Sequence, residues 1–231
     1  MPMSETDLKS RLLQAAKPHV PFDGWSEATL RLAAEEARVA AALVTAVFPR
    51  GAVDLALAYH EEGDAAMLAR LAEADLGAMR FRDRVAFAVR ARLEAVEDRE
   101  LVRRGMTLFA LPQHAADGAR ALWSTADRIW TVLGDTSQDI NWYTKRATLS
   151  GVYGATVLYW LGDESEGQQA TWEFLDRRIE DVMRIEKVKA QARGNRLVAG
   201  LMAGPLSVLG RVRAPQRASH TGMPGRWNRT N

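Results

Sequence analysis

Few residues in this sequence have the type and spacing that catalysis or metal binding requires. The histidines are His19, His60, His114 and His220. None follows a glutamate by three residues or has a second histidine four residues away, so the helical iron and zinc motifs do not occur. The sequence also has no cysteine, no glycine-rich nucleotide loop and no Gly-x-Ser-x-Gly elbow. Adjacent carboxylates such as Glu35 and Glu36 would point about 100° apart on a helix. They do not converge on one site, so the simpler interpretation is that they are solvated surface residues. We expect a protein without catalytic residues, metal or cofactor.

The densest group of distinctive residues is the run DTSQDINWYTKRATLSGVYGATVLYW, residues 135–160. A threonine three residues before Asp139 is close to a capping box and predicts the start of a helix here. The first two turns of that helix would carry Asp139, Trp142, Tyr143 and Arg146. An aromatic pair flanked by charged groups is typical of a docking surface. The alternative is that Trp142 belongs to the core and the charges form a solvated rim.

Small residues continue along the same predicted helix. They are Ala147, Ser150, Gly151, Gly154 and Ala155, followed by Leu158. A glycine inside a helix costs about 1 kcal/mol relative to alanine, so two of them require a reason. Close packing against another helix is one explanation, and room for a bulky apolar ligand between helices is the other.

The elements that would position these residues all have helical patterns. Apolar residues recur three and four positions apart, for example at Val85, Val89 and Leu93, and no segment has the alternation of a strand. Breaks are predicted at residues 18–24, 48–51, 63–64, 111–112, 134–135 and 162–167. The 231 residues therefore predict one all-α domain of about eight to ten helices with an appended tail.

Residues 25–64 have a helix-turn-helix pattern that resembles the amino-terminal region of TetR-type repressors. The predicted turn lies at 37–39, and the helix after it ends at Phe48. That helix contains no Arg, Lys, Asn or Gln that could contact a base edge. Residues 19–64 carry three Lys+Arg against eight Asp+Glu, a balance that repels phosphates. We expect a degenerate motif and no nucleic-acid partner; the rival hypothesis is a TetR-type lipid-sensing transcriptional regulator.

Positive charge is concentrated at the carboxyl end. Residues 1–176 carry 19 Lys+Arg and 26 Asp+Glu, whereas residues 177–231 carry 12 and 3. Between Arg196 and Arg211 lie fourteen apolar or small residues, a pattern that suits an amphipathic helix at a lipid headgroup boundary. The membrane-binding residues would be Arg196, Leu197, Leu201, Met202, Leu206, Leu209 and Arg211. Burial of this segment in a dimer interface or in a helix contact is the alternative.

The run GDTSQDINWYTKRATLSGVYGATVLYW, with FPRGAVDLA before it and ATWEFLDRRIEDVM after it, resembles the accessory lipid-binding proteins of ubiquinone biosynthesis, in a bacterial form. The resemblance covers about residues 19–190. It implies a TetR-like helical bundle, homodimerisation and a pocket that binds an isoprenoid quinone or a phospholipid. It also implies a non-catalytic role in which the bound quinone intermediate is presented at the membrane to demethoxyubiquinone hydroxylase.

The resemblance assigns the hydroxylase-docking role to particular residues, and the small residues described above would supply the pocket. The hydroxylase-docking set is Asp127, Ile129, Asp139, Trp142, Tyr143 and Arg146. The lipid pocket would be lined by the small-residue set Ala147, Ser150, Gly151, Gly154, Ala155 and Leu158.

We expect five regions along the chain. They are a lead-in over 1–18, a degenerate helix-turn-helix region over 19–64, a lipid-binding and dimerisation domain over 65–193, an amphipathic membrane helix over 194–213, and a disordered tail over 214–231. The start MPMSETDLKSRLLQAAK lacks the apolar core of a signal peptide, so we expect a cytoplasmic protein on the inner face of the cell membrane.

Overall fold

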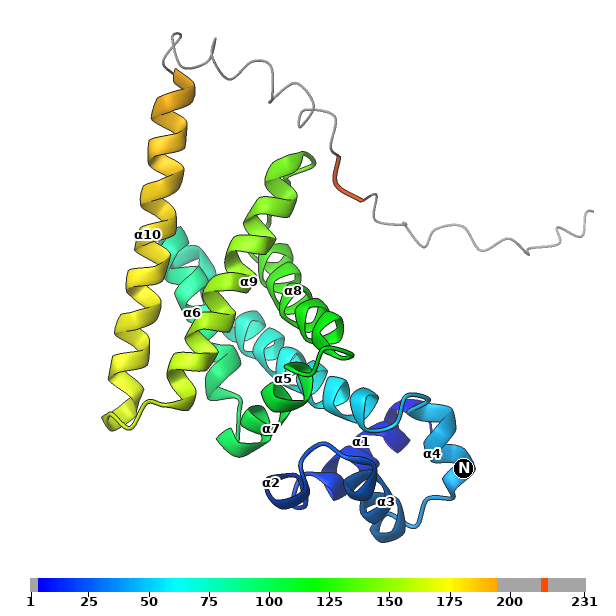
Figure 1. Cartoon of the computed structure of the whole chain (residues 1–231). Helices are drawn as coiled ribbons and strands as arrows, with labels where there is room; N and C mark the ends of the chain where they lie inside the picture. Colours follow the sequence, from blue (N-terminus) through cyan, green and yellow to red (C-terminus); the bar gives the residue numbers. More distant parts are fainter. Residues whose placement is uncertain (1–3, 195–212, 216–231) are drawn as a thin grey trace, which may run out of the picture.

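The computed structural model describes residues 4–194 and 213–215, and for residues 185–194 it describes the backbone only. These ranges form ten α-helices and two short 3-10 helices without a strand, which confirms the all-α prediction (Figure 1). The α-helices are α1 Glu5–Ala16, α2 Val20–Asp23, α3 Glu27–Glu36, α4 Ala41–Val47, α5 Ala52–Glu73, α6 Phe81–Glu94, α7 Arg99–Phe109, α8 Ala115–Val132, α9 Ile140–Leu161 and α10 Gln169–Gly194, and the 3-10 helices are η1 Leu76–Ala78 and η2 Glu166–Gln168. The expected membrane-binding set, from Arg196 to Arg211, lies outside the described residues.

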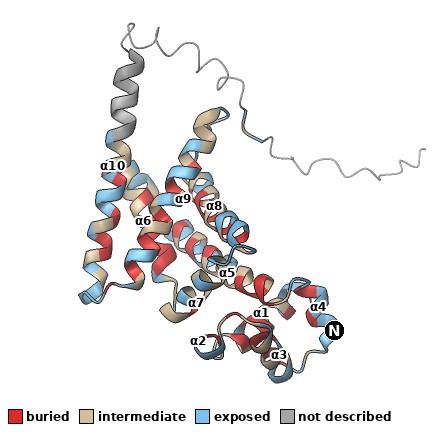
Figure 2. Ribbon diagram, in the orientation of Figure 1, coloured by how far each residue is buried: buried red, intermediate tan, exposed pale blue. Residues whose placement is uncertain are grey.

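Apolar side chains form two clusters, one at each end of α5 (Figure 2). The first packs α1 to α4 against the start of α5, where Leu12 and Leu55 are fully buried. The second packs the end of α5 with α6, α8, α9 and α10 around Met67 and Ile129. Helix α5 therefore joins the amino-terminal helices to the larger helical body.

The break predicted at residues 63–64 is wrong, because α5 runs through both positions. Gly63 serves close packing rather than a turn, because a Cβ at this position would collide with the guanidinium group of Arg92. Asp64 is buried and paired with the same arginine. The expected boundary between 64 and 65 falls within a continuous helix. The breaks predicted at 48–51, 111–112, 134–135 and 162–167 do lie between helices, and 18–24 contains the short α2.

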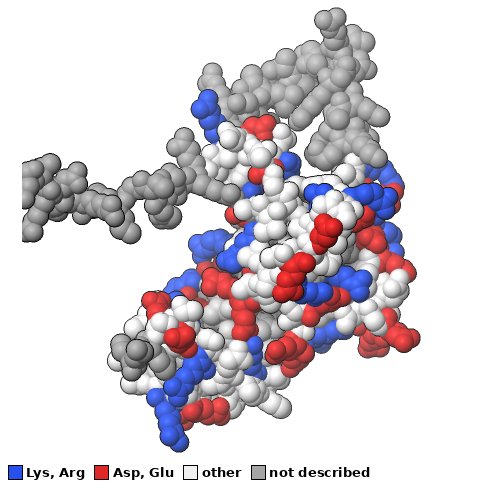
Figure 3. All heavy atoms as spheres, turned by 180° about the vertical axis from the view of Figure 1, so that it is seen from behind, with Lys and Arg blue, Asp and Glu red and all other residues white. Residues whose placement is uncertain are grey.

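The helix-turn-helix region has the predicted turn. Helices α3 and α4 flank residues 37–40, and Arg38 adopts a left-handed conformation with φ 53°. Helix α4 exposes Leu43 and several alanines, and its one exposed polar side chain, Thr45, donates to the Ala41 carbonyl of its own helix. On the face seen in Figure 3, acidic and basic side chains are interspersed rather than gathered into one basic surface.

Among the described residues, no single helix is long and apolar enough to cross a bilayer. Helices α4 and α5 meet those criteria only as a pair, with a bend of 59° between them.

A buried polar cluster ties α5 to α6 and α8. Asp64 has no exposed surface and accepts hydrogen bonds from Arg92 Nε and from the Thr125 hydroxyl, both at 2.8 Å. His60 Nε2 lies 3.1 Å from the Ala121 carbonyl and 2.8 Å from Thr125 Oγ1. Because a carbonyl can only accept, Nε2 carries the proton. Burial lowers the pKa of His60 to about 4, although the nearby Asp64 opposes that shift. His60 is therefore neutral at physiological pH.

This low pKa makes the stability of the fold depend on pH. In the unfolded chain His60 binds a proton below its ordinary pKa of about 6.5, whereas the folded protein resists protonation down to about pH 4. We therefore predict that the free energy of unfolding falls as the pH is lowered through this window, by at most about 1.4 kcal/mol per pH unit. His60→Gln keeps a donor near the Nε2 position but cannot titrate, so it should reduce the slope.

Urea unfolding at several pH values measures this slope. His19→Gln, at a half-exposed histidine paired with Glu36, is the matched control. An unchanged slope in His60→Gln would contradict the role assigned to this side chain.

Candidate functional site

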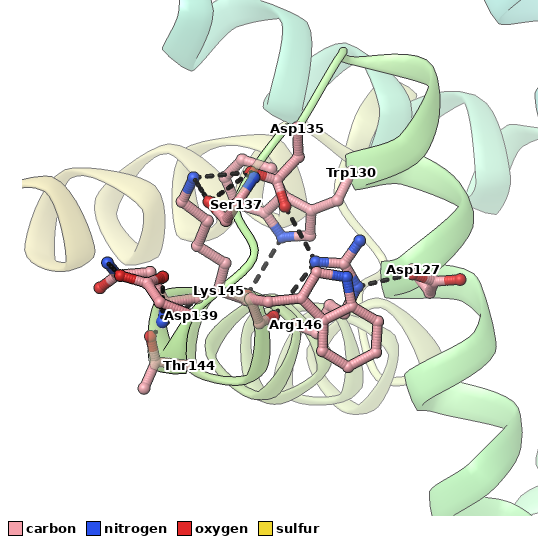
Figure 4. Close-up of polar contacts among 10 residues, drawn as sticks. Asp127, Trp130, Asp135, Ser137, Asp139, Thr144, Lys145 and Arg146 are labelled. Carbon is pink, nitrogen blue, oxygen red and sulfur yellow. Dashed lines mark hydrogen bonds and ion pairs between the residues drawn. The ribbon is translucent and has the colours of Figure 1, made fainter. Parts of the chain in front are cut away.

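The connection between α8 and α9, residues 133–139, positions the residues that the sequence singled out (Figure 4). It turns at Gly134, whose φ of 79° favours glycine. Helix α9 begins at Ile140, and the carboxylate of Asp139 caps it by accepting from the Asn141 backbone N–H at 3.0 Å. The predicted start of the helix is close to correct, but the cap is Asp139 itself rather than the threonine three residues earlier.

Arg146 is the buried centre of an ionic network that also includes Asp127, Asp135, Ser137 and Lys145. Its side chain has no exposed surface. Its Nε donates to Asp127, and its Nη1 donates to Asp135 at 2.9 Å. Asp135 also accepts from Lys145 Nζ at 2.7 Å and from the Ser137 hydroxyl at 2.8 Å. Burial alone would raise the pKa of Asp135, but these hydrogen bonds outweigh it and hold the pKa well below its ordinary range.

The network supports an aromatic patch made of Trp123, Trp142 and Tyr143. The Trp142 ring lies over the Arg146 guanidinium, with 4.0 Å between the guanidinium carbon and the ring centroid. The Trp142 ring centroid is 5.8 Å from that of Trp123 and 4.8 Å from that of Tyr143. All three side chains are half-buried. Trp142 is thus neither a core residue nor a free surface residue. The Arg146 guanidinium packs against one face of its ring, while the side chain remains partly accessible.

Two residues of the expected docking set cannot contact a partner directly. Ile129 and Arg146 both have no exposed surface, so assigning them to a contact surface is wrong. Ile129 packs in the second apolar cluster, and Arg146 supports Trp142 from below. Asp127 and Tyr143 are partly accessible, and Asp139 is exposed.

Sequence reasoning missed Trp123 and Asp135. Trp123 lies one helical turn before Asp127 on α8, and residues four positions apart share a helix face. This spacing could have placed Trp123 beside the expected docking set.

Residues 213–215 lie against the α8–α9 connection and Tyr143. The Ala214 N–H donates to the Gln138 carbonyl at 2.9 Å, and the Tyr143 hydroxyl donates to the Arg213 carbonyl at 3.3 Å. Ala214, which the sequence assigned to a disordered tail, is thereby hydrogen-bonded to the α8–α9 connection.

The small-residue set on α9 does not line either of the two main apolar cavities of the described residues. Ala147, Gly151 and Leu158 are exposed, and a Cβ at Gly151 would meet nothing within 4 Å. A Cβ at Gly154 would lie 3.4 Å from Leu122 Cδ1 on α8. At Gly154 the alternative explanation, close packing of two helices, fits the structure. The expected pocket lining at Ala147, Ser150, Gly151, Gly154, Ala155 and Leu158 therefore lies outside both of these cavities.

The central cavity, of about 360 Å³, lies between α5, α6, α7, α8 and α9. Most of its wall is apolar and includes Val102, Met106, Phe109 and Leu122. A second cavity of about 380 Å³ lies between α6, α8, α9 and α10 and includes Trp130 and Lys145. Neither cavity is visible in a local pattern, because each wall is assembled from at least four helices.

The folded chain belongs to a recognisable structural class. It is similar to the TetR transcriptional regulator from Nitrosomonas europaea, with a TM-score of 0.60 over 75% of this chain and 96% of that one. The two sequences are 17% identical, so the similarity concerns the fold alone. The class is therefore the TetR-like all-helical fold, as the sequence predicts.

Sequence comparison identifies the family. The family model COQ9 matches residues 115–186, which include α8, α9 and the aromatic patch. The ubiquinone biosynthesis protein COQ9, mitochondrial, of Rattus norvegicus is 32% identical over 215 residues, which cover 89% of this chain and 69% of that protein. The Drosophila melanogaster protein of the same name is 33% identical over 192 residues, and the match spans 81% of this chain but only 59% of that protein. This chain is a member of the COQ9 family.

The Arg146 network predicts a large effect of a single substitution. Arg146→Met leaves the buried Asp135 with Lys145 as its one cationic partner and removes the guanidinium that packs against Trp142, so it should lower the free energy of unfolding by about 3–5 kcal/mol. Denaturant unfolding followed by tryptophan emission measures this loss. The matched control is Arg80→Met, at an arginine that is largely exposed and pairs with Asp83 on the surface; it should cost less than about 1 kcal/mol. Similar costs for both variants would contradict a structural role for the network.

Proposed function

We propose that this chain is a non-catalytic lipid-binding accessory protein of ubiquinone biosynthesis. It binds an isoprenoid quinone intermediate and presents it to demethoxyubiquinone hydroxylase. Membership of the COQ9 family supports the pathway, since the curated relatives are named ubiquinone biosynthesis proteins. The observation that carries the lipid-binding part is the central cavity.

The central cavity suits an apolar ligand. Its volume of about 360 Å³ lies near the lower end of ligand pockets, which span about 300–1,000 Å³. A ring with a short stretch of isoprenoid tail fits this space, whereas a long polyprenyl chain would extend beyond it. Burial of the apolar tail in this cavity would stabilise the complex by about 25 cal/mol for each Å² of tail surface removed from water.

A substitution that fills the cavity tests lipid binding. Val102 lies in the cavity wall on α7, so Val102→Trp places an indole in the space that the ligand would occupy. We predict loss of isoprenoid lipid that co-purifies with the protein, measured by mass spectrometry of an organic extract. Val132→Trp, at an exposed valine that lines neither cavity, should retain the lipid. Equal lipid content in the two variants would contradict the assignment of the cavity.

The aromatic patch is our proposed hydroxylase-docking surface. Large aromatic side chains held rigidly by their surroundings are the residues that dominate binding energy at protein interfaces. Trp142 has this form, because Arg146 holds one ring face while Trp123 and Tyr143 border it. Asp127 and Asp139 would form part of the charged rim.

Truncation of Trp142 tests docking separately from lipid binding. Trp142→Ala should weaken co-purification with the hydroxylase, by about 30-fold in affinity if the residue contributes about 2 kcal/mol. Its lipid content should stay unchanged, because Trp142 does not line the central cavity. Phe22→Ala, at an exposed aromatic residue on α2, is the control and should bind normally. Parallel loss of lipid and hydroxylase in Trp142→Ala would instead indicate a general structural role.

We further propose homodimerisation and peripheral membrane association through the segment from Arg196 to Arg211. The inner face of the cell membrane remains our predicted location, and the curated relatives are named mitochondrial proteins. We also propose that the chain does not bind nucleic acid. The exposed face of α4 has no charged side chain, which supports this proposal.

A further inference from the structure

The central cavity contains polar side chains grouped around one arginine. Tyr59, His60, Arg92 and Tyr153 all line it. Arg92 Nη2 donates to the His60 carbonyl at 3.0 Å, and its charge acts on both phenols. The rest of the wall is mostly apolar. The cavity therefore has a polar end and an apolar remainder, the shape expected for a ligand with a polar head and a hydrocarbon tail.

Both phenol hydroxyls at this end lack a hydrogen-bond partner among the described residues. The Tyr153 side chain is almost fully buried, with 4% of its surface exposed, yet its hydroxyl makes no hydrogen bond to protein. Tyr59 packs against Trp25 and likewise makes none. Buried tyrosine hydroxyls ordinarily find a partner, because leaving one unpaired is costly. These two hydroxyls are free to bond to a molecule in the cavity.

His60 offers a hydrogen-bond acceptor that complements the two phenol donors. Its Nε2 donates to the Ala121 carbonyl and to Thr125, so its Nδ1 is an acceptor without a partner among the described residues. Two hydroxyls and one ring nitrogen without a partner among the described residues thus belong to side chains that line the central cavity.

The charge at this end is already paired. Arg92 donates to the buried Asp64 carboxylate, so an anionic ligand would have to compete with Asp64 for the guanidinium. An unpaired anion buried here would carry a large desolvation cost. An uncharged head with oxygen substituents carries no such cost.

We propose that Tyr59, Tyr153 and His60 form a recognition site for the head of the ligand, and that this head is an uncharged ring with carbonyl, hydroxyl or methoxy oxygens. The phenol hydroxyls donate to ring oxygens, and His60 Nδ1 accepts from a ring hydroxyl when one is present. The tail runs along the apolar wall past Val102 and Met106. This inference rests on the proposed function, and it adds the residues that recognise the head and the orientation of the ligand.

Three probes of similar tail length separate the contributions of head and tail. They are a ubiquinone with two isoprenoid units, the hydrocarbon myrcene, and geranic acid, which has a carboxylate head. Calorimetric titration of the full chain measures their affinities. Tyr153→Phe and Tyr59→Phe remove one hydroxyl each with little change in shape. Tyr159→Phe, at an exposed tyrosine on α9 that does not line the central cavity, is the matched control.

We expect Tyr153→Phe and Tyr59→Phe each to weaken quinone binding about threefold to tenfold, the range for one lost hydrogen bond. Myrcene binding should be unchanged in both variants, and Tyr159→Phe should bind all probes as the unaltered chain does. Unchanged quinone affinity in both variants, equal losses for quinone and myrcene, or tighter binding of geranic acid than of quinone would overturn the head site while leaving lipid binding in place. If the unaltered chain bound neither quinone nor myrcene, the proposed function would fail together with this inference.

Discussion

The structure around the candidate site depends on the burial of one arginine. A guanidinium that leaves water loses several kcal/mol of hydration, so Arg146 is stable inside the protein only with well-placed partners. Two carboxylates, a backbone carbonyl and the face of an indole supply them. These partners come from α8, from the α8–α9 connection and from α9, so one side chain fixes how the three segments meet. The position of Trp142, and with it the form of the aromatic patch, follows from that interaction.

Helix α9 joins this patch to the central cavity. Its first two turns carry Trp142 and Arg146, and further along Tyr153 and Val157 line the cavity. Eleven residues of helix separate Trp142 from Tyr153, which corresponds to about 16 Å along the axis. A ligand in the cavity and a partner protein on the patch would therefore contact the same rigid element. This arrangement suits a protein that holds a lipid for another protein to act on.

The sequence predicts those features that depend on local pattern. Helical periodicity indicated the all-α fold, the helix-turn-helix pattern predicted the turn at 37–39, and the run around Trp142 indicated the family. Ala126, Ile129 and Leu133 recur three and four positions apart in the sequence. This spacing agrees with the burial of Ile129 and conflicts with its assignment by resemblance to a docking surface.

The errors arise where residues distant in sequence decide the outcome. Gly63 suggested a break, but Arg92, on another helix, explains the glycine. The small residues of α9 suggested a pocket, but helix packing at Gly154 accounts for part of the set. The cavity is assembled mainly from side chains on α5, α7, α8 and α9 that no local pattern connects.

The central claim is that this chain delivers a quinone intermediate to the hydroxylase. The most direct test is the quinone profile of cells that lack the chain, measured by liquid chromatography and mass spectrometry with and without the intact gene restored. The account predicts that demethoxyubiquinone accumulates in the deletion strain and that the intact chain restores ubiquinone. A normal ubiquinone level without any accumulated intermediate in the deletion strain would contradict it.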